Sequence, residues 1–214
     1  MEKIKNGITE LVIVIDKSGS MEGLEEDTIG GINAMLKEQK SIDGECYVTA
    51  VMFNEAWEFT YDRVKLSQVK PLTKKDYRVG GCTALIDALG SSIEHIETIH
   101  KYIRKEDVPE HVMFFITTDG LENASHKFSS DDVKRKIEAK KEVGWEFVFA
   151  GANIDAVETA KTYGIAEENA FDYHADSIGT NVIYKCAGKK LGAMRRNMPS
   201  VAWREEADAD FESR

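Results

Sequence analysis

Residues 12 to 21 read VIVIDKSGSM, an apolar run that ends in an acid and is followed by two serines around a glycine. The apolar run, residues 11 to 15, is typical of a central parallel strand that is covered on both faces of its sheet. Asp16, Ser18 and Ser20 follow at alternate positions, so their oxygen atoms can point to one side of the loop. The stretch therefore predicts a buried strand that leads directly into a polar site.

Length and charge limit what kind of protein this is. The chain has 214 residues, which suits one α/β domain, and its 42% hydrophobic content supports a packed core. The formal net charge is -10, and no cluster of lysine and arginine stands out. Because nucleic-acid binding needs a basic surface that displaces counterions, we expect no nucleic-acid partner.

The N-terminal residues lack the pattern of a signal peptide, since the first apolar run begins only at Leu11. No stretch approaches the roughly 20 apolar residues that a membrane span needs, so no membrane partner is expected. The three cysteines, Cys46, Cys82 and Cys186, are odd in number and far apart. They are interpreted as reduced thiols, and the sequence therefore indicates a cytoplasmic protein.

Strand-like and helix-like segments alternate along the chain. Apolar runs predict further strands over residues 46–53, 112–116 and 145–150, and an antiparallel edge strand over residues 55–64. Apolar residues at helical spacing predict helices over 29–36 and 85–103, after Ser129, after Asp155, and over 176–196. This alternation predicts an α/β fold, a doubly wound, mostly parallel central sheet of about six strands with helices on both faces.

No internal repeat or linker divides the sequence, so we expect one domain over residues 1–198. Its last helix should bury a stripe formed by Ile178, Val182, Ile183 and Met194. After Pro199 the composition becomes acidic, and residues 199–214 are expected to be a flexible tail.

Ligands of open α/β sheets bind beyond the carboxyl ends of the strands. There the sequence places DKSGS at 16–20, GGCTALIDAL at 80–89 and TTDG at 117–120. These segments contribute five oxygen-bearing side chains: Asp16, Ser18, Ser20, Thr83 and Asp119. Hard oxygen ligands without histidine or cysteine favour Mg²⁺ or Mn²⁺ over zinc and copper. We therefore expect a divalent-metal site and no other cofactor.

The three segments resemble the metal-ion-dependent adhesion site of von Willebrand factor type A (vWA) domains, and the resemblance extends over nearly the whole chain. It is closest to small stand-alone bacterial members. The resemblance implies a Rossmann-like vWA fold, and it implies that Asp16, Ser18 and Ser20 form the D-x-S-x-S loop. Thr83 and Asp119 would be the lone threonine and the lone aspartate of that site. It also implies metal-dependent binding of a protein partner that supplies an Asp or Glu side chain, with no catalysis.

Two other functions remain open from the sequence. One is a Mg²⁺-dependent phosphohydrolase, in which Asp16 would attack phosphorus, although position 18 is a serine where such enzymes usually carry a second acid. The other is a structural or oligomerisation domain whose site binds nothing. No nucleotide-binding glycine loop and no G-x-S-x-G nucleophile motif is present in the 214 residues, so we expect no enzyme.

Overall fold

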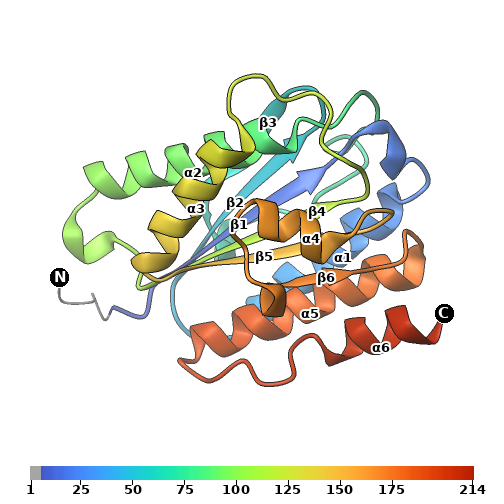
Figure 1. Cartoon of the computed structure of the whole chain (residues 1–214). Helices are drawn as coiled ribbons and strands as arrows, with labels where there is room; N and C mark the ends of the chain where they lie inside the picture. The colour runs from blue at the N-terminus through green and yellow to red at the C-terminus, as the bar shows by residue number, and fades with distance from the viewer. Residues whose placement is uncertain (1–5) are drawn as a thin grey trace.

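The computed structural model of the chain describes residues 6 to 214; residues 1 to 5, which our predicted domain included, lie outside the described part. The described residues form one sheet with the strand order β3-β2-β1-β4-β5-β6 (Figure 1). Its strands are β1 (Thr9–Asp16), β2 (Cys46–Phe53), β3 (Trp57–Lys65), β4 (His111–Thr118), β5 (Trp145–Gly151) and β6 (Ala170–Asp172). All neighbours pair in parallel except β2 and β3, which pair antiparallel at one edge.

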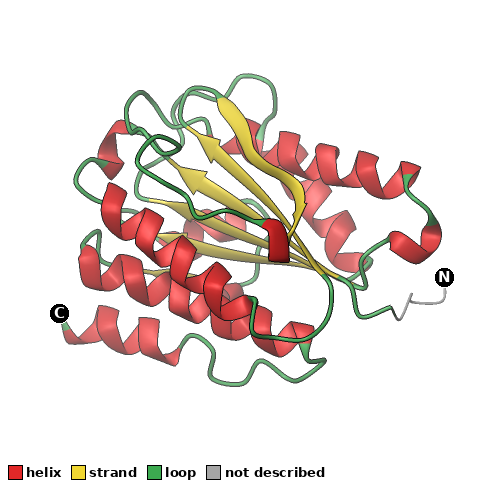
Figure 2. Ribbon diagram, turned by 180° about the vertical axis from the view of Figure 1, so that it is seen from behind, coloured by secondary structure: helices red, strands yellow, loops and turns green. Residues whose placement is uncertain are grey.

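Helices cover both faces of this sheet (Figures 1 and 2). They are α1 (Glu25–Gln39), α2 (Leu85–Tyr102), α3 (Ser130–Glu142), α4 (Ala156–Thr162), α5 (Ser177–Arg195) and α6 (Glu205–Ser213). Side chains from α1, α5 and α6 belong to one hydrophobic core, and side chains from α2, α3 and α4 belong to a second. The predicted doubly wound α/β architecture is therefore confirmed.

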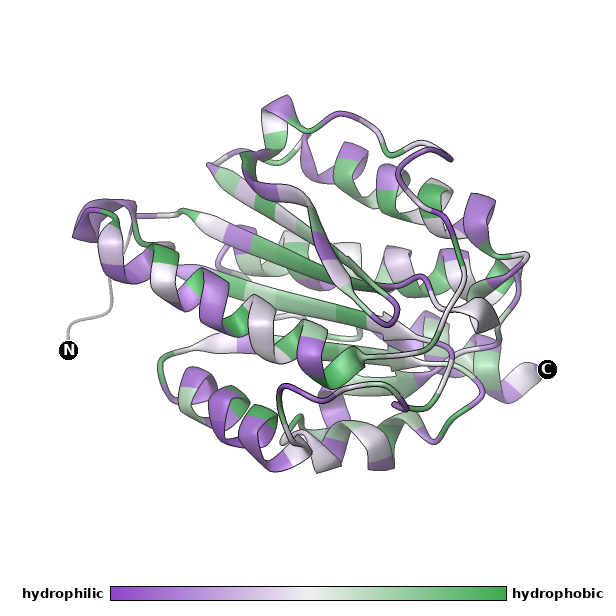
Figure 3. Cartoon of the chain, turned by 90° about the horizontal axis from the view of Figure 1, so that it is seen from above, coloured by the Kyte–Doolittle hydropathy of each residue, from purple (hydrophilic) through white to green (hydrophobic). Residues whose placement is uncertain are grey.

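The alternation of side chains in β1 explains why the sheet needs two cores. Leu11, Ile13 and Ile15 lie in the core shared with α1 and α5, whereas Val12 and Val14 lie in the core shared with α2 and α3. Successive strand residues point to opposite faces, so a strand without polar alternation has to be covered on both sides. The hydropathy colouring shows this as apolar strands between helices of mixed character (Figure 3).

Three helices begin where the sequence predicts. The Ser129 hydroxyl accepts a hydrogen bond from the backbone N–H of Asp132, whose side chain caps in return, before α3. Asp155 and Asp176 cap α4 and α5 through their carboxylates. The buried stripe of α5 is only partly as predicted, because Ile183 is buried while Ile178 is 57% exposed at the first turn.

The C-terminal ends of the sheet and of the chain contain elements that the sequence pattern does not identify. The three-residue strand β6 has no pattern long enough to identify it from the sequence. The sequence predicts a flexible tail over residues 199–214, whereas in the structure α6 and the turn before it pack on the fold. Trp203 and Ala207 lie four residues apart and are both buried, and Trp203 makes an edge-to-face contact with Phe171 of β6 at 5.6 Å between ring centroids. Ala207 is the buried residue of this acidic helix, and Trp203, in the turn before it, adds a second apolar contact with the fold.

The sequence also predicts reduced cysteines and no membrane-spanning helix. All three cysteines are free, with Cys46 and Cys186 buried and Cys82 exposed. Burial raises the pKa of the Cys46 thiol to about 11, so this thiol is protonated and unreactive near neutral pH. Between residues 6 and 214, no helix combines the length and the apolar character that crossing a bilayer requires.

Candidate metal site

The carboxyl ends of β1 and β4 lie next to each other because the two strands are parallel neighbours, with Ile15 opposite Thr117. Asp16 is the last residue of β1, and Asp119 follows the last residue of β4. The loops that leave both strands therefore start at the same edge of the sheet, and the structure brings all five predicted ligand residues to this edge.

Asp16 connects the two loops through its buried carboxylate. Its Oδ1 accepts a hydrogen bond from the backbone N–H of Ser18 at 2.7 Å, and its Oδ2 accepts one from the Thr118 hydroxyl at 2.6 Å. The phenol of Tyr77 donates to the backbone carbonyl of the same residue. Each carboxylate oxygen still has a second lone pair for another ligand. Asp16 thus fixes the positions of both loops while keeping the capacity to bind a cation.

Ser20 joins the first loop to Asp119. Its hydroxyl donates a hydrogen bond to Asp119 Oδ1 and lies 3.0 Å from the hydroxyl oxygen of Ser18. The second carboxylate oxygen, Asp119 Oδ2, is buried and has no hydrogen-bond partner among the described residues. A buried acceptor without a partner is costly, so this atom needs a ligand that the protein itself does not supply.

Thr83 completes the group from the other side of Gly120. A methyl group added to Gly120 would lie 3.3 Å from the Ser20 hydroxyl oxygen and 3.6 Å from that of Thr83. The Ser20 and Thr83 hydroxyl oxygens therefore both lie close to Gly120, which leaves room for them because it has no side chain. The glycine at this position keeps the space between these oxygens open.

Burial shifts the titration of both acids in the same direction. Burial raises the pKa of Asp16, against the hydrogen bonds from Ser18 and Thr118, which lower it. Burial also raises the pKa of Asp119, with a further contribution from the nearby Asp16 carboxylate and against the hydrogen bond from Ser20. No cationic side chain contributes to either pKa shift. A positive ion between the two buried carboxylates would therefore stabilise their ionised forms.

A second set of residues, which the sequence did not single out, holds the Asp119 loop against the start of α2. Asn123 Oδ1 accepts a hydrogen bond from the backbone N–H of Thr83 at 2.9 Å, and the Thr83 carbonyl accepts one from the N–H of Asn123 at 3.0 Å. Glu122 accepts from the N–H of Ile86 at 2.8 Å. Buried Asp87 accepts from three consecutive backbone N–H groups, residues 126 to 128. Thr83 and Asp119 are therefore positioned as one unit.

The donor set fits a small, oxygen-preferring divalent cation. It consists of two carboxylates and three hydroxyl groups, and the unpaired Asp119 Oδ2 lies among them. No group of three or more histidine, cysteine or acidic side chains suited to a metal occurs within residues 6 to 214. A cation that requires nitrogen, sulfur or many carboxylates would therefore find a poor site here.

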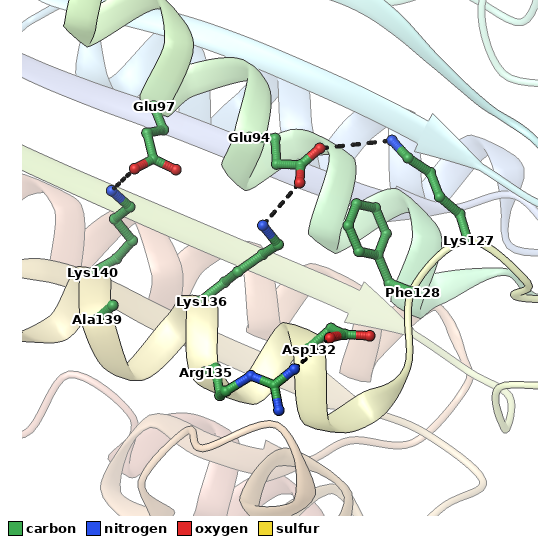
Figure 4. A pocket seen from close by; sticks show the side chains of 9 residues that line it. All are labelled: Glu94, Glu97, Lys127, Phe128, Asp132, Arg135, Lys136, Ala139 and Lys140. Atoms are coloured by element: carbon green, nitrogen blue, oxygen red, sulfur yellow. Dashed lines mark hydrogen bonds and ion pairs between the residues drawn. The ribbon is translucent and has the colours of Figure 1, made fainter.

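Two hollows in the surface lie outside this group of oxygens. One, of about 550 Å³, lies between α2 and α3, where Lys136 and Lys140 reach across to Glu94 and Glu97 (Figure 4). These charges satisfy one another, which is typical of an interhelical salt-bridge ladder and gives no indication of a ligand. The other, of about 500 Å³, lies beyond β5 and β6 and is bordered by His174 and Phe211, whose rings stack at 4.8 Å.

Comparison with known proteins identifies the fold. No family model and no curated protein sequence matches the chain. Among solved structures, proximal thread matrix protein 1 from the mussel byssus matches 87% of this chain and 46% of its own, with 15% identity and a TM-score of 0.59. The ArnB paralog VWA2 from Sulfolobus acidocaldarius matches 86% of this chain and 45% of its own, with 16% identity and a TM-score of 0.56.

The von Willebrand factor domain of the type V pili tip protein from Porphyromonas gingivalis covers 87% of this chain and 95% of its own, with 10% identity and a TM-score of 0.61. The chain thus has the vWA fold, and the predicted Rossmann-like vWA architecture is confirmed. It spans slightly less than half the length of the mussel and Sulfolobus chains. One structure of the mussel protein has a zinc-occupied metal-ion-dependent adhesion motif.

Proposed function

We propose that this chain is a divalent-metal-dependent protein-binding module. In this proposal Asp16, Ser18, Ser20, Thr83 and Asp119 hold Mg²⁺ or Mn²⁺ at the carboxyl edge of the sheet. The observation that carries the proposal is the buried Asp119 Oδ2, which has no hydrogen-bond partner among residues 6 to 214 and belongs to the carboxylate that the Ser20 hydroxyl contacts. The vWA fold supports it further, because a relative of the same fold carries a metal at the corresponding motif.

The chemistry of these ligands favours a partner with an acidic side chain. Three of the five groups are neutral hydroxyls, so the protein contributes at most two negative charges to a divalent ion. These five residues would hold a divalent cation, which would supply Lewis acidity toward an anionic oxygen. A carboxylate from an Asp or Glu of the partner protein would then be attracted to this site, even though the whole chain has a net charge of -10.

Asp16 is poorly suited to the alternative function, phosphoryl transfer. Its side chain is 0% exposed, and both carboxylate oxygens already accept hydrogen bonds. Lys17, the cation next to it, pairs with Glu58, which lies on the edge strand β3. A nucleophilic aspartate has to reach the phosphorus atom of its substrate, and a cation has to offset the developing charge. We therefore propose a binding module without enzymatic activity, with neither a nucleic acid nor a membrane as partner, acting in the cytoplasm.

Affinity capture tests the proposal. Wild-type protein and the Asp119→Ala variant are immobilised and exposed to native lysate in Mg²⁺, then washed with EDTA. A partner that elutes with EDTA from the wild type, returns with Mg²⁺ and is absent from Asp119→Ala is the expected result. A partner that binds both proteins equally in EDTA would show that binding uses another face. A structural domain with an unused site would capture no EDTA-sensitive partner.

A further inference from the structure

Two side chains flank the proposed metal loop on opposite sides. Glu55 lies in the turn between β2 and β3, and Leu121 lies two residues after Asp119 in the loop that follows β4. Because β1 lies between β2 and β4 in the sheet, the loop that carries Ser18 and Ser20 separates these two positions. Any partner that places a carboxylate over this loop therefore meets an apolar side chain on one side and an acid on the other.

Leu121 is exposed to solvent, and hydrogen bonds order the backbone on both sides of it. Its side chain is 67% exposed, although it follows directly after Gly120, whose backbone N–H donates a hydrogen bond to the Thr118 hydroxyl at 3.4 Å. On its other side, the Glu122 carboxylate accepts from three backbone N–H groups, those of residues 86, 124 and 125. The backbone on both sides of Leu121 is thus fixed, so the loop does not fold this side chain inward. An exposed leucine alone is ordinary, but this one follows Asp119 by two residues, in the loop at the carboxyl end of β4.

Glu55 brings a negative charge against the loop on the opposite side. Its Oε2 accepts a hydrogen bond from the backbone N–H of Cys82 at 3.1 Å, and a methyl group on Gly81 would overlap this carboxylate. The Gly81 carbonyl in turn accepts from the N–H of Gly19, which lies between the two serines. Glu55 is exposed and forms no ion pair within residues 6 to 214, not even with Arg78 in the adjoining loop. Its charge is therefore available to a partner.

We propose that this edge of the sheet recognises a protein segment whose Asp or Glu is flanked by an apolar side chain on one side and by Lys or Arg on the other. The apolar side chain covers Leu121, and the basic side chain pairs with Glu55. This inference rests on the proposed function, because the central acid is held by the metal. Burial of apolar surface contributes affinity, whereas the charge pair at the rim contributes orientation and partner choice.

The test selects random short peptides displayed on phage, bound to the wild type in Mg²⁺ and eluted with EDTA. We expect enriched sequences with a central acid, an apolar residue on one side and Lys or Arg on the other. Leu121→Ser should weaken the binding of a synthetic peptide of this kind about tenfold. Glu55→Gln should remove the preference for Lys or Arg. Val143→Ser and Glu142→Gln are the matched controls, since both residues are exposed at the end of α3, at the opposite edge of the sheet, and should change neither property.

The possible results distinguish the preference for flanking residues from metal-dependent binding itself. EDTA-eluted peptides that share an acid but no flanking preference, with affinities unchanged in Leu121→Ser and Glu55→Gln, would overturn the inference and leave the metal-bridged binding intact. If no peptide elutes with EDTA, both the proposed function and this inference fail.

Discussion

The hydroxyl group of Ser20, in the loop after β1, donates a hydrogen bond to Asp119 Oδ1, in the loop after β4, although 99 residues separate the two positions. The other oxygen of the same carboxylate is buried without a hydrogen bond inside the described part of the chain. This relationship is the basis of the proposed metal site, because the Ser20 hydroxyl orients one oxygen of Asp119 while the other has no partner in residues 6 to 214. It depends on the parallel pairing of β1 with β4, which brings the two loops to one edge.

Removal of the Ser20 hydroxyl should weaken metal binding without unfolding the protein. Ser20 is exposed, so Ser20→Ala creates no cavity, yet it removes one proposed ligand and the group that orients Asp119. We expect Mg²⁺ affinity to fall about 10–100-fold, the usual cost of losing a group that orients a metal ligand. Calorimetric titration measures this, with Ser41→Ala, another exposed serine, as the control. Equal affinities in wild type and Ser20→Ala would contradict the role given to Ser20.

Asp16 should destabilise the metal-free protein at neutral pH. A carboxyl whose pKa is raised in the folded state binds its proton more tightly there than in the unfolded chain. The neutral carboxyl therefore contributes stability that is fully present below the ordinary aspartate pKa of about 4. This contribution is lost as the pH rises through the higher pKa of the folded state, where the carboxyl ionises. In EDTA at pH 7, Asp16→Asn should unfold at a higher temperature than the wild type.

The difference between Asp16→Asn and wild type should disappear as the pH falls below about 4, where both side chains are neutral. Added Mg²⁺ should reverse the order at pH 7, because binding to the folded state stabilises the wild type by about 2.7 kcal/mol at a hundredfold excess over the dissociation constant. Thermal unfolding followed by circular dichroism measures both effects. A wild type that is more stable than Asp16→Asn in EDTA at pH 7 would show that burial does not penalise this carboxylate.

Asn123 should act on metal binding although it is not a proposed ligand. Its side chain accepts the hydrogen bond from the Thr83 N–H and so joins Thr83 to the Asp119 loop. Asn123→Ala should cost about 1 kcal/mol of stability, the usual value of one hydrogen bond, but lower Mg²⁺ affinity at least about tenfold. Asn181→Ala, which removes a side-chain hydrogen bond on α5, is the control. If both variants bind Mg²⁺ like the wild type, Thr83 does not need this support.

Trp203→Ala tests whether the C-terminal segment belongs to the fold. Trp203 is 7% exposed and packs on Phe171. Its removal should lower the free energy of unfolding by about 3 kcal/mol, as for other large buried aromatic side chains. Val201→Ala, at a nearby residue that is 81% exposed, should change it by less than about 0.5 kcal/mol. Chemical denaturation measures both, and equal small effects would return this segment to the flexible tail that its composition suggests.

The buried strands and the places of the predicted ligands at the strand ends could be predicted from the sequence, because both depend on local patterns. Continuous apolar runs identify buried strands, and polar residues at strand ends mark the edge where parallel strands meet. The hydrogen bond from the Ser18 N–H to Asp16 is likewise local, spanning two residues. Such features depend on residues that are close together in the sequence.

Other features depend on contacts between distant segments and carry no local signal. Asp87 reads as one more polar residue on a helix, yet it is buried because the loop of residues 126–128 folds onto it. Asn123 meets Thr83 across forty residues of sequence. In α6 acidic residues dominate the composition, and burial is limited to Ala207 and to Trp203 in the turn before the helix. Tertiary packing decides these positions.

Calorimetric titration of Mg²⁺ into metal-free wild type and Asp119→Ala tests the central claim most directly. We expect one binding event per wild-type chain and none in Asp119→Ala, because that substitution removes the unpaired buried oxygen on which the proposed site depends. Circular dichroism establishes that both proteins are folded. Equal Mg²⁺ binding by the two proteins, or no binding of Mg²⁺ or Mn²⁺ by the folded wild type, would contradict a metal site at this edge of the sheet.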